Sequence, residues 1–401
     1  MNEADAGKYH WMLGTRQART VYYRKDFIDY TLMCIANAAL VAVSFGPRHP
    51  LAWLGVALSL LMAASFARRH GISITTPLIL KRPQDALYMA LYKLANIRLV
   101  WFAALALLAA ENLFIHLTPS WPHHTDLMRT IGTWLLIIHF VALSAYRTVI
   151  LFAHLRRTEL IREILMQTAW RKAIDEKTGM TWEVFHAYFT GMLAHVVMLA
   201  PSFLVLRYAE FSVLALPVTL ALNVLLYVKW GNTFNDWFYR DHWVAHNSEL
   251  EFVYLHGPHH DAIPSGLIGC SGNGFIEGYF RQALGSPMPF YNPAFAAVSF
   301  SLDVLGDIDM HQYIPGIFPK MTLEDLHAIH HSIHHYGRIE PYSFGVKFDH
   351  PNVSDAYRKK NRFLPEQMKN SIRIDERLNG FDWNNPTFRH IVSLFEKYHD
   401  A

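Results

Sequence analysis

The chain has 401 residues, of which 52% are hydrophobic and 17% are charged, whereas ordinary soluble domains carry roughly 25% charged residues. This charge deficit and the positive mean hydropathy of +0.11 indicate that part of the chain contacts lipid. The formal net charge of +3 implies no nucleic-acid partner. The two distant cysteines, Cys34 and Cys270, indicate neither a disulfide framework nor a Cys-based metal motif.

Six apolar stretches have about the 20 residues that a helix needs to cross roughly 30 Å of hydrocarbon. In chain order they are residues 27–45, 50–67, 99–117, 131–154, 184–206 and 211–230. The sequence therefore predicts an all-α, polytopic membrane helical bundle, with a short segment, 1–26, before a transmembrane region at 27–230.

The distribution of lysine and arginine predicts the orientation of these helices. The number of lysines and arginines is 5 before the first stretch and then 1, 6, 1, 6 and 1 in the five successive connections. Because basic connections remain in the cytosol, this alternation predicts a cytosolic N-terminus. Six crossings then return the chain to the cytosolic side near residue 230, so the following segment, 231–345, is expected on the cytosolic face.

Segment 231–345 is rich in histidine and has its own predicted membrane element. The Gly- and Pro-rich stretch 263–274 interrupts any long helix, and 290–305 is apolar but short. Together with 267–284 it predicts a membrane hairpin near residues 265–306, which leaves the histidines on either side of it at one membrane face. The polar and basic segment 346–401 predicts a cytosolic C-terminal cap.

Eleven of the 24 histidines lie between His242 and His335, a stretch of 94 residues. Spacings of three and four residues place imidazole rings on one helix face. Imidazole is a suitable ligand for Fe, Zn, Cu and Ni, and eight or more rings exceed the number that one ion binds, so the count predicts two metal ions. The groups are His242 and His246; His256, His259 and His260; His311; and His327, His330, His331, His334 and His335.

Two features of these groups qualify the ligand prediction. Either triad of the last group could supply ligands, and we favour the later one, which begins at His331, over His327 and His330. Pro258 fits a helix only in its first turn, so we expect a helix to restart near His259.

Neutral imidazoles leave the charge of two cations uncompensated, and carboxylates that accept the outer ring N–H of a ligand histidine would offset it. Asp236, Asp241 and Asp261 lie close enough in sequence to serve. A chance cluster on a solvated loop is the simpler alternative for the whole group, but so many repeated spacings disfavour it.

The motifs HWVAH at 242–246, HGPHH at 256–260 and HSIHH at 331–335 resemble the H-x3-H, H-x2-HH and H-x2-HH pattern of the fatty acid hydroxylase/sterol desaturase superfamily of membrane di-metal oxidases. Asp236 and Tyr239 precede the first motif with the spacing of that family, and His311 supplies a histidine before the last motif. The resemblance covers residues 236–345, departs from the family at Trp243 and at 261–264, and leaves the N-terminal half unexplained.

The resemblance implies an enzyme in which two iron ions and O2 hydroxylate or desaturate a C–H bond of a lipid such as a fatty acyl chain or a sterol. The histidines of the three motifs and His311 would be the ligands, with Asp236, Tyr239, Asp241 and Asp261 around them and no further catalytic side chain. Zinc could occupy the same rings in purified protein. The lipid-like substrate would enter from the membrane, either a bacterial inner membrane or the endoplasmic reticulum.

Electrons for this reaction would come from another protein. The sequence contains neither an H-P-G-G haem motif nor a G-x-G-x-x-G nucleotide fingerprint. We therefore expect a separate donor, such as a ferredoxin, a cytochrome or a reductase.

Two other functions remain as alternatives. A haem-b electron carrier would use histidines inside the apolar stretches, such as His139 and His195, but it leaves the three motifs without a role. A metal transporter would line the membrane midplane with its ligands, whereas these motifs follow the last long apolar stretch.

Overall fold

The computed structural model describes residues 26–95, 99–156, 158–159, 162, 169–231, 241–242, 245, 248–262, 276–279 and 292–311. Every regular element in these ranges is helical, as predicted. The elements are α2 (Phe27–Phe45), α3 (Pro50–His70), α4 (Leu78–Lys81), α5 (Pro83–Ala95), α6 (Leu99–Leu117), α7 (Thr125–Leu155), α9 (Ala169–Thr178), α10 (Met180–Tyr208), α11 (Leu216–Gly231), α13 (Glu249–Glu251), a π-helix η2 (Phe252–His256), α14 (Gly257–Asp261) and α16 (Pro293–His311).

Five of the described helices, α2, α3, α6, α7 and α10, are long and apolar enough to cross a membrane. The expected sixth stretch, 211–230, forms the shorter helix α11, whose 16 residues span about 24 Å. It begins at Leu216, with Pro217 in its first turn, where proline is tolerated. The residues before it are bound to the α6–α7 region, because Ser212 N donates to Glu111 Oε1 (2.9 Å) and Val213 N donates to the carbonyl of His123 (2.9 Å).

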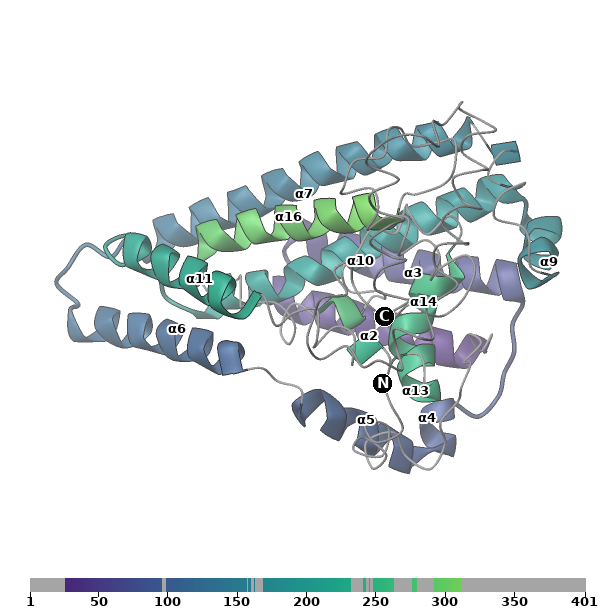
Figure 1. Cartoon of the computed structure of the whole chain (residues 1–401), viewed down its shortest axis with the longest axis horizontal. Coiled ribbons are helices and arrows are strands. Elements are labelled where there is room, and N and C mark those ends of the chain that lie inside the picture. The colour runs from purple at the N-terminus through teal and green to yellow at the C-terminus, as the bar shows by residue number, and fades with distance from the viewer. Residues whose placement is uncertain are drawn as a thin grey trace, which may run out of the picture.

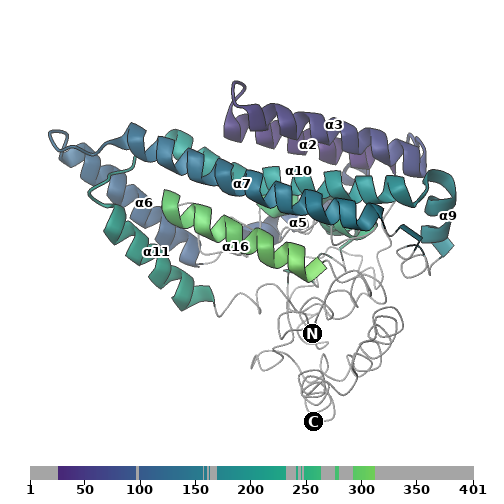
Figure 2. The same cartoon turned by 90° about the horizontal axis from the view of Figure 1, so that it is seen from above.

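Helix α10 forms the centre of the bundle. The most apolar 18-residue stretch of α10 is 78% buried, whereas the corresponding stretches of the other four long helices are 22–44% buried. Helices α2 and α3 pack on one side of it, and α7 and α16 pack on the other (Figure 2). Gly55 permits a close approach on the first side, because a Cβ there would lie 2.5 Å from Val41 Cγ1 and 3.2 Å from Val196 Cγ1.

Helix α16 is the apolar helix predicted at 290–305, and it lies along α7 (Figure 1). A Cβ at Gly132 would lie 2.7 Å from Pro293 Cβ, and further along both helices Ser301 Oγ lies 2.6 Å from His139 Nδ1. The two helices therefore run parallel, and α16 ends at the end of the bundle where α7 ends. Helix α3 also ends there and α10 begins there, because Arg69 is hydrogen-bonded to Glu183.

Several predicted segments lie largely or wholly outside the described residues. They are the N-terminal segment 1–26, most of the first half of the hairpin at 267–284, and the C-terminal cap at 346–401.

Candidate metal centre

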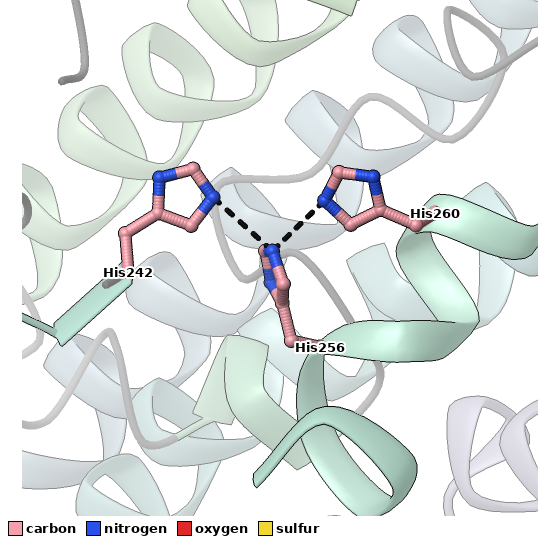
Figure 3. Close-up of side chains that lie close together, drawn as sticks. All are labelled: His242, His256 and His260. Carbon is pink, nitrogen blue, oxygen red and sulfur yellow. Dashed lines mark hydrogen bonds between the residues drawn. The ribbon is translucent and has the colours of Figure 1, made fainter. Parts of the chain in front are cut away.

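Three predicted ligands, His242, His256 and His260, converge at the end of the bundle where α3 and α7 end (Figure 3). His256 Nε2 lies 3.1 Å from His242 Nε2 and 2.9 Å from His260 Nε2, and the three ligand atoms all lie within 4.8 Å of one another. Metal–imidazole bonds of about 2.0–2.1 Å would place two ligand nitrogens about 3.0 Å apart at a right angle. The group could therefore hold a metal ion.

A second pair of histidines lies beside this group. His259 Nε2 is 3.2 Å from His311 Nε2, and both residues are buried. The ring centroid of His259 lies 5.5 Å from that of His256 and 5.2 Å from that of His260. Helix α16 thus brings His311 back to the segment that carries the second histidine motif.

Hydrogen bonds to the outer ring nitrogens set the tautomers of two of these histidines. His311 Nδ1 lies 2.7 Å from the carbonyl oxygen of Asp307, which can only accept, so Nδ1 carries the proton and Nε2, which faces His259, is the unprotonated nitrogen. His256 Nδ1 lies 3.4 Å from Glu277 Oε2, and because a carboxylate oxygen accepts, this longer contact also favours a proton on Nδ1. In both residues the nitrogen that faces another histidine is therefore the one suited to bind a metal.

A π-helical turn shapes the segment that carries the second motif. The side chain of Ser248 caps α13, and the π-helix η2 leads without a break into α14. The α-helix restarts at Gly257, two residues before the expected His259, and Pro258 lies in its first turn, where its missing N–H breaks no helical bond. Such π turns occur frequently at functional sites.

One partly buried lysine and three buried carboxylates lie next to the histidines. Lys93 Nζ, from α5, lies 2.8 Å from Asp241 Oδ1 and 3.3 Å from Glu251 Oε2. Burial opposes the charge of Lys93, but the attraction of Asp241, Glu251 and Glu277 outweighs it and raises the pKa of Lys93. Burial raises the pKa of Glu251 to about 7, with Lys93 opposing and Asp241 adding to the shift.

A second buried network joins α14 to two membrane helices. Arg69 donates to both carboxylate oxygens of Glu183, to the side chain of Asp261 and to the Asp261 carbonyl oxygen (2.9 Å). His70 Nε2 lies 3.1 Å from Asp261 Oδ2. Burial disfavours the charge of Asp261, but the attraction of Arg69 and His70 outweighs it and holds the pKa of this carboxyl well below its usual range.

The structure thus brings together five predicted ligands. The other six, as well as Asp236 and Tyr239, lie outside the described residues. Asp241 and Asp261 are buried nearby, bound to Lys93 and Arg69 respectively. The predicted ligands that are brought together are His242, His256, His259, His260 and His311; those outside the described residues are His246, His327, His330, His331, His334 and His335.

Reasoning from the sequence missed Glu277, Lys93, Arg69 and Glu183. Arg69 and Glu183 are charged residues at the ends of apolar stretches, and such placement is a signal of function or of ion pairing that could have singled them out. Lys93 and Glu277 carry no comparable signal.

A comparison of the chain with protein-family models, with curated proteins and with solved structures finds no match. The structure shows an all-α protein, in its described part, with five candidate membrane-spanning helices and a buried group of three histidines that could hold a metal ion.

Proposed function

We propose that this chain is an O2-dependent, non-haem di-iron oxidase that hydroxylates or desaturates a C–H bond of a membrane lipid. The convergence of His242, His256 and His260 is the observation on which this proposal depends, with the adjoining pair of His259 and His311 as the start of a second ligand group. The similarity of the three histidine motifs to the fatty acid hydroxylase/sterol desaturase superfamily supports the choice of reaction.

The residues of the site fit a divalent cation. Asp241 and Glu251 are buried and both contact Lys93, so among the described residues this group carries more negative than positive charge when both carboxylates are ionised. Uncompensated charge is costly to bury. A cation on the neighbouring imidazoles would offset that excess, and the Nε2 lone pairs of His256 and His311 are oriented to receive it.

The reaction assigns separate tasks to the metal and to the chain. Bound iron would supply the activation of O2 that oxidation of an unreactive C–H bond requires. For hydroxylation, the C–H bond, O2, two electrons and two protons give an alcohol and water. Glu277 and the Asp307 carbonyl hold the rings of His256 and His311, while the buried Phe252, whose ring centroid lies 6.0 Å from those of His256 and His260, helps to exclude water.

Electrons and topology complete the proposal. The two electrons would come from a separate ferredoxin, cytochrome or reductase that reaches the end of the bundle carrying the histidines. The alternation of basic residues supports a cytosolic position for that end, and it is the side at which a soluble donor would be available.

The contacts of the histidines inside the bundle disfavour the haem alternative. Both ring nitrogens of His195 lie within 3.0 Å of Arg147 Nη2, so a guanidinium occupies the space next to the ring. His139 Nδ1 is hydrogen-bonded to Ser301. The histidine cluster lies at one end of the bundle and not at its middle, which disfavours a transporter.

Metal analysis and product analysis test the proposal. Protein purified from iron-replete cells should hold about two iron ions per chain. His256→Ala should remove them, whereas the matched control His139→Ala should retain them. One iron or none in the unaltered chain would contradict the di-iron assignment. The lipids of cells that express the chain should gain oxygen from isotopically heavy O2 or gain a double bond, and neither change should occur with His256→Ala.

A further inference from the structure

The connection between α3 and α6 exposes a row of large apolar side chains. Their exposed fractions run from 38% at Leu91 to 82% at Ile74. Within α5, Leu87, Leu91 and Leu94 recur at intervals of four and three residues and therefore share one helix face, while Leu80 lies on α4, before the non-helical Arg82. The exposed residues are Ile72, Ile74, Leu80, Leu87, Leu91 and Leu94.

The opposite, inward side of the same segment buries Leu78 and Tyr92 and also holds charged side chains in ion pairs. Lys93 binds Asp241 and Glu251, and Arg82, between α4 and α5, lies 2.6 Å from Glu249. An amphipathic helix on a water-exposed surface has the reverse arrangement, with apolar residues inside and charged residues outside. The exposed leucines and the inward ion pairs of this segment therefore depart from that arrangement.

We propose that α4 and α5 lie in the interfacial layer of the membrane, with their leucine face against the acyl chains of the lipids. Helix α3 ends at His70 and α6 begins at Leu99, so both ends of the segment are fixed to membrane-spanning helices. Leu60 (68% exposed), on α3, and Leu99 (70%), on α6, are exposed apolar residues of these two membrane-spanning helices. The exposed, basic Lys81 adjoins Leu80, as expected where a helix meets anionic headgroups.

Helix α9 lies in another connection between membrane-spanning helices at this end of the bundle, and it does not expose a comparable row of leucines. Helix α9 precedes α10 in the connection between α7 and α10, and it exposes Glu176 and Lys177. Its outer face is thus suited to water. The leucine face of α4 and α5 is a property of one connection.

The ion pairs couple this interfacial segment to the metal centre. Helix α5 packs beside α13 (Figure 1). Lys93 holds Asp241, which immediately precedes His242, and Arg82 holds Glu249, which begins the helical course leading to His256. The histidines are therefore held at the surface of one leaflet. If the proposed oxidation is correct, on which this last step depends, the C–H bond that reacts belongs to a lipid in that leaflet.

Nitroxide depth measurements test the proposal. In a chain that carries Cys34→Ala and Cys270→Ala, spin labels are placed at Leu87→Cys or Leu94→Cys, and the protein is reconstituted into phosphatidylcholine–phosphatidylglycerol vesicles. The matched control is Glu176→Cys on α9. Because Leu87 and Leu94 are 57% and 65% exposed, their replacement removes little core packing.

Labels at both leucine positions should be more accessible to O2, which is concentrated in lipid, than to a water-soluble nickel chelate. The label on α9 should show the reverse. Preferential access of the chelate at 87 and 94 would place the face in water. Immobile labels that neither reagent reaches would show that protein covers it, and both results overturn the proposal. The measurement needs no metal, so a chain without iron would refute the proposed oxidase and leave the depth result intact.

Discussion

Replacement of Arg69 by methionine should destabilise the protein and weaken its hold on metal. The guanidinium of Arg69 is fully buried and is paired with the carboxylates of Glu183 and Asp261, whose side chains are 0% and 2% exposed. Removing one partner of a buried ion pair typically costs about 3–5 kcal/mol, because the remaining charge is left uncompensated. Arg69→Met leaves two such carboxylates, so we expect a loss at the upper end of this range.

The effect should reach the metal centre through Asp261. This residue directly follows His260, and Arg69 holds both its side chain and its carbonyl oxygen. Without that anchor the end of α14 gains freedom, and His260 loses its fixed position beside His256. Arg69→Lys keeps the charge but lacks the planar fork that binds two carboxylates at once, so it should restore only part of the stability and of the bound metal.

The assay compares the thermal midpoint and the metal content of purified variants in detergent. Arg129→Met is a matched control, because Arg129 is half-buried and donates to the carbonyl of Ala209 (2.8 Å), at the opposite end of α10 from Glu183. Adding Glu183→Gln to Arg69→Met should recover part of the midpoint, since it removes one orphaned charge. An Arg69→Met protein with an unchanged midpoint, or with a loss no larger than that of Arg129→Met, would refute this account of the network.

Three further changes address the metal centre and its surroundings. His242→Ala should lower bound iron, measured by elemental analysis, while an alanine at His49, which caps α3 and packs against Phe45 and Phe203, should not. Lys93→Met should destabilise the metal-free protein more than the metal-loaded one in thermal melts, because bound cations replace part of the lost positive charge next to Asp241. Burial raises the pKa of Glu251 to about 7, above its ordinary 4.5, so the folded chain loses stability as the pH rises through this range. Glu251→Gln should therefore raise the free energy of unfolding of chelator-treated protein by at most about 3 kcal/mol at about pH 8 and change it little at about pH 4; an equal gain at both pH values would contradict the raised pKa.

Hydropathy and length predicted most of the membrane helices, but not all of their ends. The apolar stretch 131–154 lies within α7, which begins six residues earlier at Thr125 because the polar first turns remain helical outside the apolar window. The stretch 211–230 lost its first residues to hydrogen bonds with Glu111 and His123. Apolar periodicity carries no information about such tertiary partners, so these ends required the structure.

Motif spacing predicted the part of the site that lies on one helical segment. His256 and His260 are four residues apart, and their nitrogens meet as the spacing requires. The pairing of His259 with His311 depends instead on α16 running parallel to α7, which spacing does not encode. The contacts of Lys93 with Asp241 and of Arg69 with Asp261 join residues 148 and 192 positions apart, and no local pattern marks either pair.

The two buried charge clusters have different relations to a bound metal. Asp261 and Glu183 both pair with Arg69, with His70 beside Asp261, and the lowered pKa of Asp261 keeps it ionised whether or not a metal is present. Asp241, Glu251 and Glu277 share the attraction of Lys93, but burial outweighs that attraction at Glu251 and raises the pKa of this residue to about 7. A cation bound to His242, His256 and His260 would add positive charge beside this second cluster and favour its ionised form, so metal binding near neutral pH should release protons from Glu251 as well as from the ligand histidines. The Arg69 network is therefore an anchor for α14, whereas the charge of the Lys93 cluster should change when a metal binds.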